Sequence, residues 1–281
     1  MPKFSIVTPV TLDKESPDNN RMPRYEMFLR CASSVFGQVY DDFEWIIADD
    51  VSNPPIEEIL EKHDSWWKPK GLQVKVVRLP EKSGRLIARN RGMEAASGEW
   101  ITWLDADDEY ASIYLSAIND AIRVYPEFKI FNFNHLIFSY NYGVHIRKFM
   151  NMDEWGDRPF GSGMIGAGSF VFHRDVYNQI GLLPEKSLWD FAEGAFEEFP
   201  EIRQFFEKKD ADGKPTGQFN SLGNPWGEDY YYWYKMTRKN KAKYLDTALY
   251  YVHSRWGHRW QDDPNYVVDP GKQPEFNPQN R

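Results

Sequence analysis

The feature that most constrains the fold is an alternation of short apolar runs with amphipathic segments along the first 125 residues. Residues 4–8, 43–48 and 100–104 form apolar runs of the length of buried strands. Between them, residues 25–38 and 85–96 carry apolar side chains at helical spacing. Strands and helices that alternate in this way predict an α/β fold with a mostly parallel central sheet flanked by helices.

The second half of the chain is less regular. Its strand-like runs are separated by long polar stretches, and residues from 261 onward are polar and rich in proline. We expect this last stretch to form a tail with little structure of its own. The further elements that the pattern predicts are helices at 56–63, 112–125 and 228–239 and strands at 72–79, 129–138, 169–172 and 242–253.

Composition excludes several classes of protein. The formal net charge of −8 argues against a general nucleic-acid binder, which normally carries a basic excess. The single cysteine, Cys31, excludes an internal disulfide and a cysteine-based metal cluster. No run approaches the roughly 20 apolar residues that span a membrane, and a strand-like run follows the first residues directly. These features predict a soluble, cytoplasmic protein.

Two clusters of carboxylates follow predicted strands. They are Asp49-Asp50 and the run Asp105-Ala106-Asp107-Asp108. Ligands of open parallel sheets collect at the carboxyl ends of strands, and crowded carboxylates favour a hard divalent cation such as Mg²⁺ or Mn²⁺. Alternatively, each cluster caps the helix that follows, although three carboxylates exceed what one cap uses. A calcium-binding EF-hand is disfavoured because Tyr110 stands where that loop requires glycine.

Three further residues have both a functional and a structural interpretation. Arg89, on the helix before the acidic strand, could neutralise a phosphate or form an ordinary ion pair. Asp229, at the start of a predicted helix, could accept a proton or stabilise the helix end. His253, after the last strand, could complete a metal shell or be structural.

The sequence resembles the inverting family 2 glycosyltransferases, which have the Rossmann-like GT-A fold. The resemblance rests on the continuous pattern of Gly84–Gly92, Ala96–Ile101 and Leu104–Asp108, which is similar to the family's G-x-x-x-A-R-N-x-G, A-x-G-E-[YW]-I and L-D-A-D-D runs. It is densest over residues 4–110 and returns over 161–253. It implies one GT-A domain with a smaller acceptor-side subregion. Its donor-binding half would be 1–110 and its acceptor-binding and catalytic-base half 111–260, followed by a polar tail at 261–281.

The resemblance implies roles for the residues that match the family pattern. On the donor side, Thr8 and Asp50 would contact the nucleoside, Arg89 would lie by the phosphates, and Asp105 would reach the ribose or a metal-bound water.

It also implies a divalent cation, Mn²⁺ or Mg²⁺, and a catalytic base. Asp107 would ligate the metal, His253 would join its shell, and Asp229 would be the general base.

The implied reaction is transfer of one sugar from a nucleoside diphosphate sugar, most commonly a UDP-sugar, to a hydroxyl acceptor. The family's processive enzymes carry Gln-x-x-Arg-Trp, whereas here Val252 and Trp256 stand in the glutamine positions before Arg255 and Arg259. A non-processive enzyme is therefore expected. A saccharide, a lipid-linked glycan, a protein or modified DNA could be the acceptor.

Two other functions fit part of the pattern. A nucleotidyltransferase also uses paired aspartates and a divalent ion, but it usually needs a glycine-rich basic loop after the first strand, and residues 8–11 are Thr-Pro-Val-Thr. A nucleotide-sugar-binding protein that has lost catalysis is the second alternative. Retention of Asp105, Asp107 and Asp229 argues against it.

Overall fold

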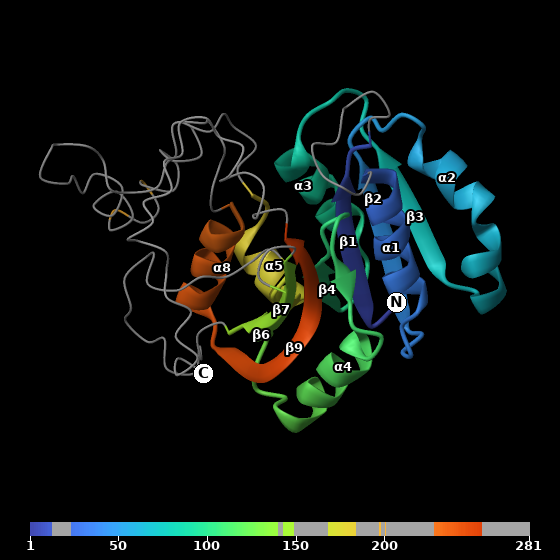
Figure 1. Ribbon diagram of the computed structural model, residues 1–281. Helices are drawn as coiled ribbons and strands as arrows, with labels where there is room; N and C mark the ends of the chain where they lie inside the picture. The colour runs from blue at the N-terminus through green and yellow to red at the C-terminus, as the bar shows by residue number, and fades with distance from the viewer. Residues whose placement is uncertain are drawn as a thin grey trace, which may run out of the picture.

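The computed structural model describes residues 1–12, 24–139, 143–148, 168–183, 197, 200 and 228–254. Within them the strands form one nine-stranded sheet in the order β3-β2-β1-β4-β8-β6-β9-β5, with β7 paired to β6 (Figure 1). The predicted α/β class is confirmed.

The first half of the sheet is parallel, as the alternating pattern predicted. Strand β1 (Phe4–Val10) lies between β2 (Phe43–Asp49) and β4 (Trp100–Trp103), and β3 (Gln73–Arg78) pairs with the outer side of β2. Every residue of β1, β2 and β4 is buried, because helices cover both faces of the sheet.

The second half of the sheet has mixed directions. Strand β8 (Phe170–His173) runs antiparallel to β4 and to β6 (Ile130–Ser139), which in turn pairs in parallel with the long, curved β9 (Ala242–Ser254). Two short strands complete it: β5 (Glu109–Tyr110) lies antiparallel to β9, and β7 (Gly143–Arg147) lies antiparallel to β6. The parallel pairs of the predicted mostly parallel sheet are those of the first four strands and the β6–β9 pair.

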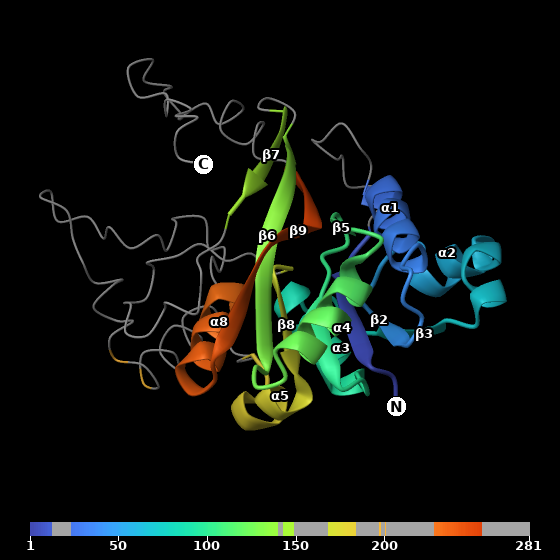
Figure 2. The ribbon, with the colours of Figure 1, turned by 90° about the horizontal axis from the view of Figure 1, so that it is seen from below.

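Three helices cover one face of the sheet. They are α1 (Arg24–Phe36), α2 (Ile56–Lys62) and α4 (Tyr114–Val124), and their apolar sides share one buried cluster with Phe4 and Trp45. Two short 3₁₀ turns, Asp64–Trp66 and Lys68–Lys70, follow α2. Figure 2 shows these helices from below.

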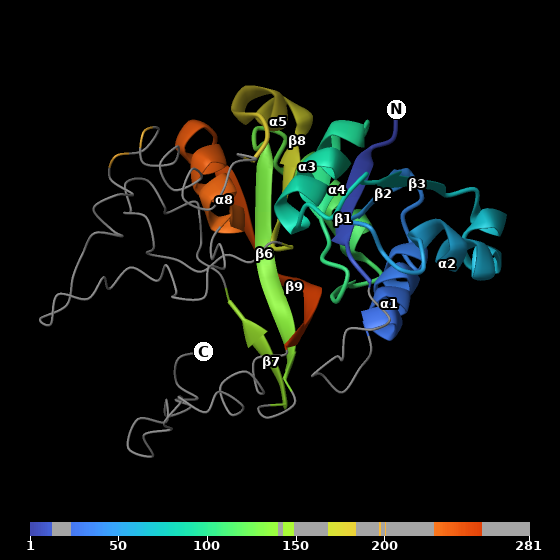
Figure 3. The same cartoon turned by 90° about the horizontal axis from the view of Figure 1, so that it is seen from above.

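Three other helices cover the opposite face. They are α3 (Arg85–Ala95), α5 (Arg174–Ile180) and α8 (Glu228–Lys239), which Figure 3 shows from above. Met93, Val176 and Trp233 from these helices form a second buried cluster with Val7 and Ile101 of the strands. The alternation of Phe4 and Ile6 with Val7 between the two clusters explains why β1 reads as a continuous apolar run.

A buried carboxylate fixes the turn that leads into β4. Glu44 Oε1 accepts hydrogen bonds from the Ser5 hydroxyl at 2.6 Å and from the backbone amides of Ser97 and Gly98 at 2.5 and 2.9 Å. A side chain at Gly98 would meet backbone atoms of Phe4 and Ser5 at 2.6 Å, so this close approach requires glycine. The turn therefore sets where β4, and the acidic run after it, begins.

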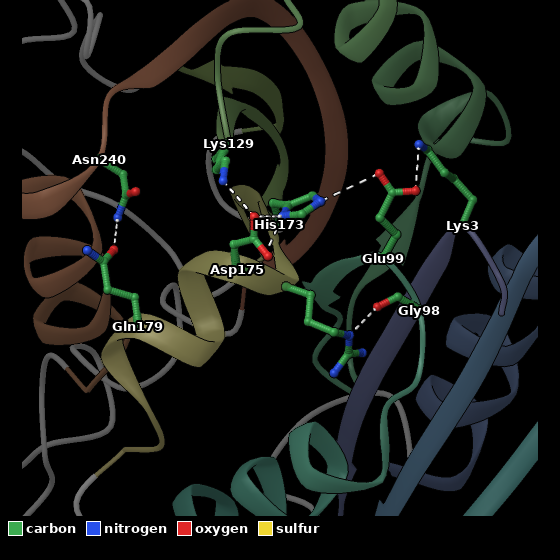
Figure 4. Close-up of polar contacts among 9 residues, drawn as sticks. Lys3, Gly98, Glu99, Lys129, His173, Asp175, Gln179 and Asn240 are labelled. Carbon is green, nitrogen blue, oxygen red and sulfur yellow. Dashed lines mark hydrogen bonds and ion pairs between the residues drawn. The ribbon is translucent and has the colours of Figure 1, made fainter.

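Polar contacts at the same end join the two halves of the sheet (Figure 4). The Arg174 guanidinium donates from Nε to the Gly98 carbonyl at 2.7 Å, and Lys3 pairs with Glu99 at 2.9 Å. The His173 ring lies between Glu99 and Asp175, at 3.5 and 3.4 Å. These contacts hold β8 and α5 against the start of β4.

The predicted bounds of the helices and strands agree closely with the observed ones, and the helix at 228–239 has the predicted ends. Among the described residues, no helix has the length and apolar character needed to cross a membrane. The sequence also predicts a loop at 12–23, a glycine-rich loop at 161–168 and an irregular polar stretch at 200–223. Most of each lies outside the described residues, as does the whole predicted tail at 261–281.

Candidate active site

A cavity of about 210 Å³ lies where β1 and β4 end, at the carboxyl edge of the parallel strands. The end of β1, the start of α1, the start of α3 and the turn after β4 form its wall. This is the edge at which ligands of open α/β sheets bind. Carboxylates and guanidinium groups share the wall with apolar side chains; the lining residues are Pro9, Val10, Thr11, Leu12, Arg24, Met27, Arg85, Asp105, Ala106 and Asp107.

The turn after β4 presents two aspartates to this cavity and turns a third inward. The Asp108 amide donates to the Asp105 carbonyl at 3.0 Å, and the Asp105 amide donates to the Tyr250 hydroxyl at 3.1 Å. Asp105 and Asp107 line the cavity, whereas Asp108 is buried. The structure thus brings together the two aspartates that the sequence singled out.

Asp108 lies in an unfavourable electrostatic environment. Burial, and then repulsion from Asp107 and Asp105, raise its pKa well above the ordinary value, although the His253 amide donates to Oδ1 at 3.1 Å. A cation held by Asp105 and Asp107 would offset this repulsion. Two carboxylates completed by substrate phosphates and water are also the ligand set that Mg²⁺ prefers. The residues present therefore fit a divalent ion.

His253 is engaged in a different interaction from the predicted one. Its Nε2 lies 2.5 Å from Glu109 Oε1 and 2.7 Å from the Arg30 guanidinium, and its ring stacks on Phe138. Burial alone would raise the pKa of Glu109, but the bond with His253 and the charge of Arg30 hold it below the ordinary value. His253 thus ties β9 to β5 and α1.

The assignment of His253 to a metal shell with Asp107 remains a prediction. Among the described residues, no three His, Cys, Asp or Glu side chains are grouped so that they could hold a metal ion.

Asp49 and Asp50 both organise loops. Asp49 accepts from the Ser52 amide at 2.7 Å and pairs with Arg78. The two oxygens of Asp50 accept from the amides of Ser83 and Gly84, at 2.6 and 2.9 Å. Asp50 therefore fixes the loop that carries Arg85 into the cavity. Each carboxylate oxygen has a second lone pair for a further donor.

Thr8 is fully buried within β1. Its Oγ1 accepts a hydrogen bond from the Trp45 indole at 2.9 Å, so its side chain faces the core. Of β1 and the segment that follows it, residues 9–12 line the cavity. The nucleoside contact implied for Thr8 remains a prediction.

Arg89 is also turned away from the cavity. Its side chain is 1% exposed, it donates from Nη2 to Asp105 Oδ1 at 2.8 Å, and its guanidinium lies 4.6 Å from the centre of the Trp103 ring. The arginines that line the cavity are Arg24 and Arg85. The sequence pattern assigned neither of them a role, because only the fold brings the starts of α1 and α3 beside the end of β4.

Asp229 is the second residue of α8, so the predicted helix start is confirmed. A carboxylate in this first turn is favourable for the helix dipole. Its assignment as the general base remains a prediction.

Comparison with known proteins identifies the family. The model of the family "Glycosyl transferase family 2" matches residues 20–181, which is more than half of the chain. TuaG of Bacillus subtilis (strain 168), named a teichuronic acid biosynthesis glycosyltransferase, is 35% identical over 77 residues, which cover 27% of this chain and 29% of TuaG. The GalNAc(5)-diNAcBac-PP-undecaprenol beta-1,3-glucosyltransferase of Campylobacter jejuni is 29% identical over 121 residues, covering 42% of this chain and 34% of that enzyme.

Solved structures confirm the fold. S. aureus TarS 1-349 in complex with UDP superimposes with a TM-score of 0.57 and 17% identity, over 90% of this chain and 60% of that one. The alignments with the two sequence relatives span about a third or less of those proteins. The chain belongs to glycosyl transferase family 2 and has the GT-A fold.

Proposed function

We propose that the chain is a metal-dependent inverting glycosyltransferase that moves one sugar from a UDP-sugar to a hydroxyl group of a saccharide acceptor, without processive addition. One observation carries the proposal: Asp105 and Asp107 share a cavity at the carboxyl edge of the sheet with Arg24 and Arg85. A diphosphate requires cationic partners of this kind, and the carboxylates suit a cation that bridges to it.

The donor would bind with its nucleoside against residues 9–12 and its diphosphate toward Arg85 and Arg24. Guanidinium groups bind phosphate oxygens through paired hydrogen bonds. Asp50 contributes by holding the amides of Ser83 and Gly84, which sets the position of Arg85. The solved TarS structures with UDP and with UDP-GlcNAc support a uridine donor as the first one to test.

Asp105 and Asp107 would hold Mn²⁺ or Mg²⁺. When bound, such an ion neutralises the charge that develops on the departing diphosphate. Tyr250 and His253 support this turn from β9, because the Tyr250 hydroxyl accepts from the Asp105 amide and the His253 amide donates to Asp108.

Asp229 would accept the proton of the acceptor hydroxyl as that oxygen attacks the anomeric carbon. The bond from the anomeric carbon to the diphosphate oxygen breaks, and the nucleoside diphosphate leaves with the bonding electrons. Attack from the opposite face inverts the anomeric configuration.

The names of the relatives support a saccharide acceptor. TuaG is named for teichuronic acid biosynthesis, and the Campylobacter relative is named a glucosyltransferase acting on an undecaprenol-linked glycan. Family membership favours sugar transfer over nucleotidyl transfer, and the released product separates the two. A glycosyltransferase releases UDP, whereas a nucleotidyltransferase releases pyrophosphate.

A thermal-shift screen of nucleotide sugars, with Mn²⁺ and with EDTA, tests the proposal. At a donor concentration about 100 times the Kd, binding stabilises the native state by about 2.7 kcal/mol. We expect a UDP-sugar to raise the Tm by several degrees in Mn²⁺ and by much less in EDTA. If no nucleotide sugar raises the Tm in either buffer, the proposed donor site is wrong.

A further inference from the structure

Arg89 is a cation buried inside the protein. Its side chain is 1% exposed, and its neighbours Ala88 and Asn90 on α3 are buried as well. Removing a guanidinium from water is costly unless the group is paired and hydrogen-bonded. The partners of Arg89 therefore show what its charge is used for.

Two of these partners, among the described residues, lie at the end of β4 and in the turn that follows. Arg89 donates from Nη2 to Asp105 Oδ1 at 2.8 Å, and its guanidinium lies over the Trp103 ring. Trp103 is itself fully buried against Phe170 and Tyr232. The guanidinium could not turn toward the cavity without leaving both partners.

We propose that Arg89 is a positioning residue, which fixes the carboxylate of Asp105 at the cavity wall and does not touch the donor. This inference rests on the proposed function, because it assigns Asp105 to the donor site. The Asp105 side chain is 33% exposed and lines the cavity, while its Oδ1 is held from behind by Arg89. The phosphates would instead meet Arg85.

Electrostatics give Arg89 a second effect on the same turn. Asp105, Asp107 and Asp108 place three carboxylates within four positions, and they repel one another. The Arg89 guanidinium, bonded to Asp105 Oδ1 at 2.8 Å, offsets part of this repulsion. A lysine would keep the charge but lose the planar group that stacks on Trp103.

A double-mutant cycle of Arg89→Gln and Asp105→Asn separates positioning from direct contact. Calorimetry would measure the Kd of UDP with Mn²⁺ and with EDTA. We expect Arg89→Gln to weaken binding in Mn²⁺ by about 10- to 100-fold, the usual effect of losing a residue that orients a metal ligand. In EDTA its Kd should stay within about twofold of wild type. In the Asp105→Asn background, Arg89→Gln should cause no further loss of UDP affinity.

Two matched variants serve as comparators. Arg85→Gln removes a cation of the cavity wall and should weaken UDP binding in both buffers. Arg91 lies on the same helix as Arg89 but pairs with Glu94 at the surface. Arg91→Gln should therefore leave the Kd of UDP unchanged in Mn²⁺ and in EDTA. If Arg89→Gln behaves as Arg85→Gln, or if its effect adds fully to that of Asp105→Asn, Arg89 contacts the donor and the inference is wrong.

Urea unfolding of wild type, the two single variants and the double variant, without nucleotide, tests this inference independently of the proposed function. Coupling between Arg89 and Asp105 predicts that the double variant loses less stability than the two single losses added together. Fully additive losses would overturn the inference. If wild type binds no UDP in Mn²⁺, the proposed donor fails, while the unfolding cycle still decides whether Arg89 acts on Asp105.

Discussion

At the scale of single residues, the aspartates of the turn after β4 divide between two environments. Asp105 and Asp107 face the cavity, whereas Asp108 is buried and receives the His253 amide. The same side-chain type therefore lines the cavity at two positions and anchors the turn at the third. We propose that the first two hold the metal.

Replacing Asp107 should remove metal-dependent activity. Asp107→Asn keeps the size of the side chain and removes its charge, so we expect turnover with a UDP-sugar and Mn²⁺ to fall at least about 100-fold. UDP release measured against Mn²⁺ concentration would check this. Asp120→Asn, an exposed carboxylate on α4, is the matched control and should leave turnover unchanged. Full activity of Asp107→Asn would refute its role.

Replacing Asp229 should separate catalysis from binding. A general base contributes about 10²- to 10⁴-fold to the rate, so Asp229→Asn should lower kcat within that range. Because Asp229 is assigned to the acceptor hydroxyl, the Kd of UDP should stay within about twofold of wild type. Single-turnover kinetics and calorimetry would measure the two quantities. Glu228→Gln is the neighbouring control, and an Asp229→Asn enzyme with unchanged kcat would show that another group is the base.

At the scale of elements, the position of β4 depends on the turn at residues 97–98. Glu44 on β2 accepts the amides of Ser97 and Gly98, and Gly98 lies against the backbone of β1. The run that resembles the family's A-x-G-E pattern thus has a structural explanation. It sets the start of the strand that delivers the acidic turn to the cavity.

The Glu44 carboxylate should make stability depend on pH. Burial alone would raise its pKa, but hydrogen bonds from Ser5, Ser97 and Gly98 hold it below the ordinary value. A group whose pKa is lowered in the folded state stabilises the protein above its unfolded pKa, about 4.3, and that contribution is lost as pH falls through the folded pKa. We expect Glu44→Gln to cost about 2 kcal/mol at pH 7.

Urea unfolding at pH 7 and at pH 3.5 would check this. The difference between wild type and Glu44→Gln should shrink at the lower pH, because below about pH 4.3 the unfolded chain takes up a proton at this carboxylate more readily than the folded protein does. Glu94→Gln, an exposed carboxylate on α3, provides the control. An equal difference at both values of pH would show that the charge of Glu44 is not what stabilises the turn.

At the scale of the whole molecule, local pattern and long-range pairing explain what could be predicted from the sequence. The periodicity of apolar residues and the Gly and Pro breakers located the long elements and the parallel first half. The elements α5, β5 and β7, of seven, two and five residues, were not predicted. The antiparallel β4–β8 pair joins residues about 70 positions apart, and no local pattern encodes such a pairing.

Local pattern and long-range packing also explain which parts of the candidate site could be predicted. Asp105 and Asp107 could be predicted because strand-end carboxylates meet at one edge of a sheet. The partners of Arg89 and His253 could not be predicted from the sequence. His253 meets Arg30 from 223 positions away, and whether Arg89 faces the cavity or the core depends on how α3 packs on β4.

The central claim is that Asp105 and Asp107 hold a divalent ion against a donor diphosphate. The most direct measurement is a crystal structure of the protein soaked with Mn²⁺ and UDP, with anomalous scattering used to locate the metal. The account predicts a manganese peak between these carboxylates and the diphosphate, with Arg85 on the phosphate oxygens. A cavity that contains neither metal nor nucleotide, or nucleotide bound elsewhere on the protein, would contradict it.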